Sequence, residues 1–459
     1  MNLNRKTEQL IESIRTGRAM TGGEKLSLIA GLSLPSMLAQ ISTVMMFFID
    51  ASMVGHLGAA ASASIGLVES TTWLVGSVMG AASSGFSVQV AHFIGANDLV
   101  RARDVFRHAL VCGLLFSLCI CLLGTAVHSA LPYWLGGGED IAADASRYFL
   151  VYSLTTPFIY LYHTSESMLK ASGNMRTPSI MAVMLCLCDV AFNYLFIFIL
   201  GQGVLGAAYG TSLAYISISL PNLWLAACRS KILNLRQDRK RFQWISIYVR
   251  NACRISIPIA IQSVLMSGAQ IVSTMIVAPL GNIAIAAHSF AVTAESLCYM
   301  PGYGIGDAAT TLVGQTYGAR RKDLCRNFAY MTVALGMAVM ALMGVVMYVF
   351  APEMVGILTP VSAIRELGAS CLRIEAFAEP FFAASIVVYS VCVGAGDTLK
   401  PAAINLGTMW FIRLTLAYVL SQQYGLQGVW TAMAIELTFR GILFLVRLFR
   451  GRWLNSFRA

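Results

Sequence analysis

Ionisable side chains interrupt several long apolar stretches of this sequence, and they are the residues most able to do chemistry. A charged group in an apolar environment is costly, so each one is a functional candidate by default. The set consists of Asp50, Glu69, Glu166, Asp189, Glu295, Asp307, Arg373, Glu375, Glu379, Arg413 and Glu436.

The first half of the chain contains a candidate cation site. Asp189 and Asn193 are four residues apart, so a helix places them on one face. Thr211 follows on the next apolar stretch, past a tight Gly-rich turn, and Asp50 is the other acid expected near the same depth. Two carboxylates, an amide oxygen and a hydroxyl suit Na⁺, and two close carboxylates resist ionising together, which suits a proton carrier. The alternative is a structural hydrogen-bond network.

The second half contains candidates for substrate binding. Glu375 and Glu379 are four residues apart on one apolar stretch, which predicts a shared helical face. Glu295 lies on an earlier stretch that we expect to line the same cavity. We interpret the three as candidates to bind a cationic substrate or a coupling ion, with a structural network as the alternative.

Two ion pairs are expected to neutralise charge inside the apolar region. Arg373 is placed to pair with Glu375 or a nearby acid, and Arg413 with Glu436. A structural role is favoured for both pairs, because a buried charge normally requires a partner.

The remaining candidates receive weaker assignments. Glu69 is expected near the outer end of its stretch, exposed to water, and Glu166 is expected to be solvated near a loop; Asp307 has no assigned role. Aromatic residues such as Phe47 and Tyr299 are expected mostly to pack or to face lipid, and the alternative is that a minority of them line a pocket for flat hydrophobic ligands.

The composition requires a membrane environment for these residues. The 459-residue chain is 57% hydrophobic and only 12% charged, whereas a soluble domain is roughly a quarter charged. A spanning helix needs about 20 mainly apolar residues. The stretches 109–127 and 328–352 contain no ionisable side chain. The sequence therefore predicts an all-α integral membrane protein.

Twelve transmembrane helices are predicted, at 26–53, 61–93, 105–128, 145–170, 177–200, 204–228, 250–278, 284–316, 327–351, 366–394, 401–421 and 426–447. Lys and Arg concentrate at the N-terminus, in alternate loops and in the segment from Arg440 to Arg458, whereas the opposite loops contain only Arg147 and Arg365. The positive-inside rule places the basic side, with both termini, in the cytoplasm. The net charge of +10 is thus a topology signal and does not indicate nucleic-acid binding.

The chain is an internal repeat with an offset of 223 residues. Pro35 aligns with Pro258, and Gly173 aligns with Gly396. Each copy holds six spans, so we predict two pseudo-symmetric lobes, 1–239 and 240–459, related by an axis along the membrane normal, with the substrate site near the midplane. The two prolines lie inside spans, as either fixed bends or hinges.

Several segments resemble the multidrug and toxic compound extrusion (MATE) family, prokaryotic type. They are FIDASMVGHLG after the first span, SGNMRTP followed by DVAFNYLFI, LVGQTYGARR after the eighth span, and GAGDTLKP after the tenth. The resemblance covers almost the whole chain and rests on their combination with the twelve-span repeat.

The resemblance implies antiport in the cell membrane, in which an organic cation leaves the cell while Na⁺ or H⁺ enters. The family's first-lobe cation site then falls on Asp50, Asp189, Asn193 and Thr211. The order of acid and amide in the fifth span is reversed here. The family's glutamate in the seventh span is absent, with Met266 in that region, and this shifts attention to Glu295 and the acids of the tenth span.

The sequence therefore predicts a secondary active exporter of an organic, cationic drug or metabolite, working as a monomer in the bilayer with no cofactor beyond the coupling ion. The alternative is a flippase for a lipid-linked precursor, which requires a basic cavity, whereas the intramembrane groups are mainly acidic. A membrane enzyme is disfavoured, since no His/Asp or Cys/His constellation appears.

Overall fold

The computed structural model describes residues 2–238 and 242–455, and within these ranges every regular element is a helix. The α-helices are α1 (Asn2–Thr16), α2 (Gly22–Gly55), α3 (Ala59–Gly95), α4 (Leu99–Val127), α5 (Leu131–Trp134), α6 (Glu139–Ala171), α7 (Arg176–Tyr194), α8 (Gly203–Trp224), α9 (Ser246–Val277), α10 (Asn282–Gly318), α11 (Lys322–Val349), α12 (Ala351–Gly356), α13 (Ser362–Ala376), α14 (Glu379–Gly394), α15 (Leu399–Gly407) and α16 (Leu414–Arg450). The described residues also form three π-helical segments, η1 (Leu195–Ile199), η2 (Leu225–Arg229) and η4 (Thr408–Arg413). Two short 3₁₀ segments are present as well, η3 (Ala278–Leu280) and η5 (Arg452–Asn455).

The described helices account for the twelve predicted spans. Nine are long and apolar enough to cross a membrane, and the bent pair α13 and α14 makes a tenth. The run from Leu399 to Arg450 is 52 residues long and turns at Gly425, whose φ of 61° is left-handed, so it supplies two spans. The more polar α6 is 33 residues long and supplies the last. The all-helical membrane fold is confirmed.

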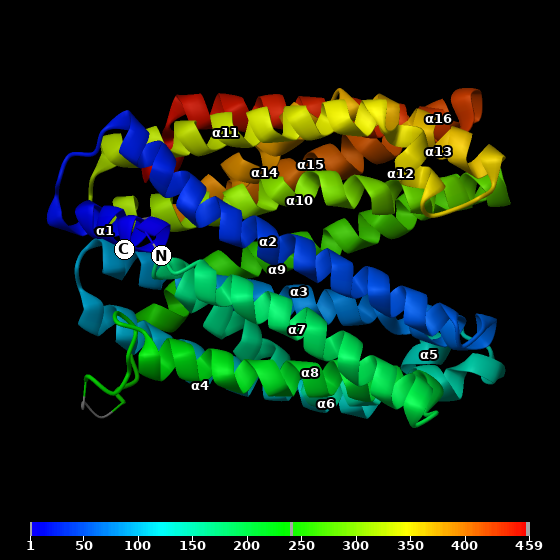
Figure 1. Cartoon of the computed structure of the whole chain (residues 1–459), viewed down its shortest axis with the longest axis horizontal. Helices are drawn as coiled ribbons and strands as arrows, with labels where there is room; N and C mark the ends of the chain where they lie inside the picture. The colour runs from blue at the N-terminus through cyan, green and yellow to red at the C-terminus, as the bar shows by residue number, and fades with distance from the viewer. Residues whose placement is uncertain (1, 239–241, 456–459) are drawn as a thin grey trace. The chain divides into compact units, whose positions relative to one another are not determined.

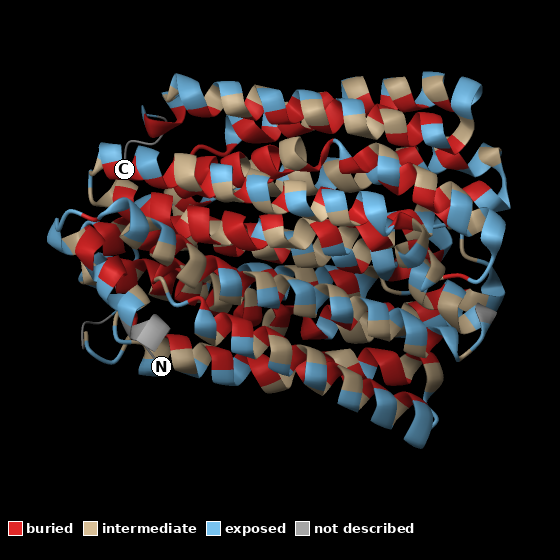
Figure 2. Cartoon of the chain, turned by 45° about the horizontal axis from the view of Figure 1, so that its top comes forward, coloured by how far each residue is buried: buried red, intermediate tan, exposed pale blue. Residues whose placement is uncertain are grey.

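The outward faces of the helices are apolar, as a lipid environment requires. On α4, Leu115, Leu122 and Leu123 are each at least 59% exposed, in a stretch with no ionisable side chain. Individual helices carry buried residues on one side and exposed residues on the other (Figure 2). In water this much exposed leucine would be unfavourable, whereas against acyl chains it is not.

The described chain forms two compact units, which divide the first helix of each repeat. One unit holds residues 42–260, and the other holds the N-terminal residues to Ile41 together with 261–459. Both divisions fall a few residues after a repeat-related proline, Pro35 in α2 and Pro258 in α9, and both helices continue through their proline. The predicted lobe boundary at 239 and 240 lies outside the described residues and stays a prediction from the repeat.

The unit of residues 42–260 is organised around α6. This helix packs against α3, α4 and α8, and α7 packs against α8 (Figure 1). The second part of α2 enters the core through Met46, which packs with Tyr162 and Leu185. The start of α9 enters through Tyr248 and Ala252, which pack among residues of α3 and α4.

The other unit is organised around α10, α11 and α14, which pack against one another, while α13 and α14 both pack against α16. Met37 of α2 packs against this core. The same helix supplies Ser36 and Gln40, whose side chains donate to Asp307 Oδ2 on α10 over 2.6 Å and 3.2 Å. Asp307, unassigned from the sequence, thus anchors α2 within this unit.

The tenth span is broken, and this corrects the prediction that Glu375 and Glu379 share a helical face. Helix α13 ends at Ala376 and α14 begins at Glu379, and the two are bent by 61°. Pro380 sits in the first turn of α14, where a proline is tolerated but disfavours a helical residue before it. The spacing of four residues therefore has no simple helical meaning here.

Candidate functional site

One side-chain amide joins the two aspartates of the first candidate site. Asn193 Nδ2 donates to Asp50 Oδ1 over 2.9 Å and to Asp189 Oδ2 over 3.1 Å. Asp50 comes from α2, whereas the other two residues lie one turn apart on α7, which passes into the π-helical η1 directly after Tyr194. The structure thus brings together three of the four predicted cation-site residues through direct contacts.

The donor set suits a small cation. Asp189 is completely buried and Asn193 is 2% exposed. Asp189 Oδ1 and Asn193 Oδ1 are buried oxygens that receive no hydrogen bond of normal geometry from the described residues, and Thr211 lies close enough to interact with the Asp189 carboxyl group. Oxygens that are buried without a donor are costly, and a bound cation would relieve that cost.

This cluster opens onto a larger cavity. Asp50, Asn193 and Thr211 all line a space of about 460 Å³ inside the unit of residues 42–260. Its walls also carry aromatic side chains, namely Phe47, Trp73, Tyr148, Tyr152 and Tyr215. Phe47 packs against the core of this unit, as expected, and also lines the cavity.

Close backbone packing fixes the position of Asn193. Gly210, the residue before Thr211 on α8, lies so near α7 that an added methyl group would overlap Asn193 Oδ1 and the Asn193 backbone. The glycine thus allows α7 and α8 to approach where the predicted cation-site residues meet. No sequence signal distinguished it from the chain's other glycines.

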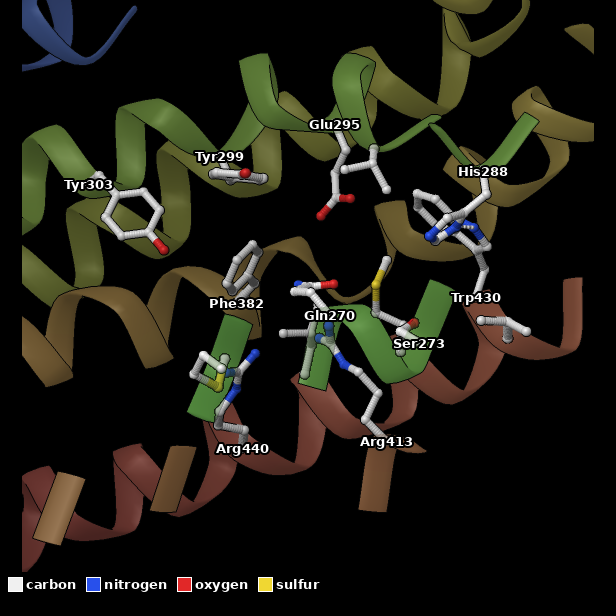
Figure 3. Close-up of a pocket in the computed structure, with 15 residues that line it drawn as sticks. Gln270, Ser273, His288, Glu295, Tyr299, Tyr303, Phe382, Arg413, Trp430 and Arg440 are labelled. Carbon is white, nitrogen blue, oxygen red and sulfur yellow. Dashed lines mark hydrogen bonds between the residues drawn. The ribbon is translucent and has the colours of Figure 1, made fainter. Parts of the chain in front are cut away.

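A second, smaller cavity lies within the other unit. It measures about 180 Å³, and Glu295 projects into it from α10 together with Tyr299 and Tyr303, which follow at helical spacing (Figure 3). Arg413 from η4 and Arg440 from α16 form the facing wall, and Phe382 and Trp430 add aromatic surface. Tyr299 packs against buried residues of this unit, as expected, and also lines the cavity.

Two arginines of this cavity share one buried carboxylate. Arg413 Nη2 lies 2.8 Å from Glu436 Oε2, which confirms the predicted pair. Arg440 Nε lies 3.2 Å from Glu436 Oε1. Arg440 was assigned to the cytoplasmic charges at the end of the chain, and this is wrong, because the residue is 6% exposed and lines the cavity. Its spacing of four residues from Glu436 was the signal that could have revealed it.

The acids of the tenth span do not line this cavity. Glu375 and Glu379 are completely buried, and their carboxyl oxygens have no hydrogen-bond partner among the described residues. Both are within electrostatic range of Glu295. The expected pairing of Arg373 with Glu375 is wrong: Arg373 is exposed and donates to the backbone oxygen of Tyr348 over 3.2 Å.

The structure also shows the surroundings of Glu69 and Glu166, the two acids with weaker assignments. Glu69 is exposed, as expected, and accepts from Trp73 Nε1 over 3.3 Å at the rim of the larger cavity. Glu166 is not freely solvated, because its side chain is only 17% exposed and pairs with Lys170 over 2.8 Å. A lysine one turn later compensates the charge.

The spans define a multi-pass membrane protein, and each of its two units holds a cavity lined in part by acidic side chains. Residues 35–195 and 258–419 match the MatE family, and the chain belongs to that family, whose members are transporters and not enzymes. The two matched segments correspond to the two copies of the repeat.

Individual relatives are distant but aligned over nearly their whole length. The chain is 25% identical to the "Probable multidrug resistance protein NorM" of Thermotoga maritima, over 92% of each chain. It is 23% identical to the protein of that name from Oceanobacillus iheyensis, over 93% of this chain and 96% of that one.

Solved structures share the fold. The chain superposes with a TM-score of 0.90 and 20% identity on a MATE protein crystallised in complex with MaL6, over 97% of this chain and 99% of that one. With a TM-score of 0.87 and 21% identity it superposes on a MOP superfamily transporter from Pyrococcus furiosus, over 96% of this chain and all of that one. The latter is described as having a binding pocket of reverse polarity that suggests a different function.

Proposed function

We propose that this protein is a secondary active exporter of small organic molecules that carry a cationic group, in exchange for Na⁺ or H⁺. The relatives named as multidrug resistance proteins support export of drugs or metabolites. The proposed orientation has both termini in the cytoplasm and the protein in the plasma membrane, following the distribution of basic residues.

One contact carries the proposal: a single amide, Asn193, holds Asp50 and Asp189 together at the wall of the larger cavity. A coupling ion bound between these carboxylates would neutralise the same negative charge that attracts an organic cation. The two ligands therefore compete electrostatically, and ion entry lowers the affinity for substrate. In the proposed exchange each ligand also binds one conformational state more tightly than the other, because only such differential affinity biases one state over another.

The larger cavity supplies the other features that an organic cation needs. Its aromatic walls offer apolar contact and cation–π attraction, which is worth about 0.5–2 kcal/mol per ring when desolvated. Exposed Glu69 at the rim adds a carboxylate that attracts cations into the cavity. The gradient of the coupling ion supplies the driving energy, which is about 1.4 kcal/mol per ion for each tenfold difference in concentration.

Proteoliposomes test this function. Purified protein is reconstituted with a fluorescent organic cation inside, and a Na⁺ gradient and a pH gradient are imposed separately. We expect one gradient to drive movement of the cation, with the substrate chemically unchanged. Transport that ignores both gradients would contradict coupled exchange, and protein-free liposomes with the same gradients control for passive leakage.

A further inference from the structure

The smaller cavity presents charges of both signs on opposite walls. The Glu295 side chain is 5% exposed and has no hydrogen-bond or ion-pair partner among the described residues, and its carboxylate points into the cavity (Figure 3). On the facing wall, Arg413 and Arg440 are 7% and 6% exposed. No ion pair among the described residues joins Glu295 to Arg413 or Arg440, so the two walls do not pair directly.

The arginine wall retains unused donors and a net charge. The Nε and Nη2 atoms of Arg413 both contact Glu436 Oε2, whereas its Nη1 has no hydrogen-bond partner in the described part of the chain. Arg440 contacts Glu436 only through Nε, and its two terminal nitrogens donate no hydrogen bond to the described residues, while its guanidinium group lies 5.9 Å from the centre of the Phe382 ring. One carboxylate thus serves two guanidinium groups, so one positive charge with several N–H donors faces the cavity.

We propose that this cavity binds a small aromatic zwitterion, with its ammonium group at Glu295 and its carboxylate at Arg413 and Arg440. Glu295 and the two arginines line the cavity, and with Glu436, which pairs with both arginines, they sum to zero charge. Glu375 and Glu379 lie outside the lining and are not counted. A bare cation or a bare anion would therefore leave one wall uncompensated and desolvated. A guanidinium fork is matched to a carboxylate.

The size and the remaining walls fit a single-ring ligand. A cavity of about 150 Å³ accommodates benzene, and this one measures about 180 Å³. Tyr299, Tyr303 and Phe382 provide aromatic contacts between the charged walls. The first repeat offers no counterpart, since Arg413 aligns with Val190 at the repeat offset. That the zwitterion is a transported substrate rests on the proposed function. That the cavity binds a zwitterion does not rest on it.

A direct binding measurement, which needs no ion gradient, distinguishes a zwitterion site from a cation site and from an anion site. Radiolabelled L-phenylalanine is bound to the purified full-length protein and is competed with two analogues. The methyl ester keeps the ammonium group and lacks the carboxylate charge, and N-acetyl-L-phenylalanine keeps the carboxylate and lacks the ammonium charge. We expect each analogue to compete about ten- to hundred-fold more weakly than unlabelled phenylalanine, the loss of one charge-assisted contact.

Substitutions test which charged group of the ligand each wall binds. Glu295→Gln should abolish discrimination against the N-acetyl compound, and Arg440→Gln should abolish discrimination against the ester. Glu353→Gln and Arg373→Gln, at exposed positions outside the cavity, are the matched controls, and thermal unfolding checks that each variant is folded.

Equal competition by the ester would show a cation site, and equal competition by the N-acetyl compound would show an anion site. Either result overturns the proposal, as does the absence of saturable phenylalanine binding up to about 10 mM. If phenylalanine still binds but no ion gradient drives transport, the proposed exporter function is contradicted and the zwitterion site is not.

Discussion

Asn193 and Asp50, 143 residues apart in sequence, meet over 2.9 Å through the amide nitrogen and a carboxylate oxygen. This contact ties α7 to α2, whose other end belongs to the second compact unit. A change in the charge of Asp50 is therefore felt directly by Asn193 and Asp189, the other residues of the proposed coupling-ion site.

We expect Asp50→Asn to abolish gradient-driven efflux while the protein remains inserted and folded. The substitution removes one of the two carboxylates but keeps a side chain of the same size. Transport in proteoliposomes and thermal unfolding of the same preparation measure the two effects. Near-normal coupled transport by a well-expressed variant would show that this carboxylate is not needed.

An exchange of Asp189 and Asn193 should retain part of the activity, whereas Asp189→Asn alone should be severe. The exchange keeps the acid count and moves the charge by one turn on the same face of α7. Initial rates of ion-driven efflux compare the two variants. If both are equally inactive, the position of the acid matters and not only the number of acids.

Gly210→Ala should weaken ion coupling although the glycine carries no chemistry. The added methyl group would overlap Asn193, and overpacking of this kind costs about 1–3 kcal/mol. Gly80→Ala is the matched control, because Gly80 lines the same cavity and has open space around its Cβ position. We expect a reduced apparent affinity for the driving ion in the first variant only.

Glu436→Gln should be strongly destabilising, by about 3–5 kcal/mol, because it leaves two buried guanidinium groups without their shared carboxylate. Thermal unfolding in detergent measures the loss. Glu353→Gln, at an exposed position, should leave the unfolding temperature unchanged. Equal stability of both variants would mean that the arginines find other partners or water.

The broken tenth span shows where spacing rules fail. The separation of four residues between Glu375 and Glu379 predicts a shared face only if the helix is continuous, and here it bends by 61° between them. The same rule was correct for Asp189 and Asn193, whose helix is unbroken. Pro380 was visible in the sequence, but its position alone did not determine whether α14 would begin there.

The sequence by itself determined the spans, the repeat, the family and the shared helical face of Asp189 and Asn193. Apolar length and charge placement are local properties that a lipid solvent imposes directly, and Asp189 and Asn193 meet through helical geometry alone. Tertiary structure decided the rest. It gave each compact unit parts of both α2 and α9, moved Arg440 from the presumed cytoplasmic end into a cavity, and set that residue and Arg413 around one carboxylate. These outcomes depend on contacts between helices far apart in sequence, where packing decides which charged side chains face a cavity and which face one another.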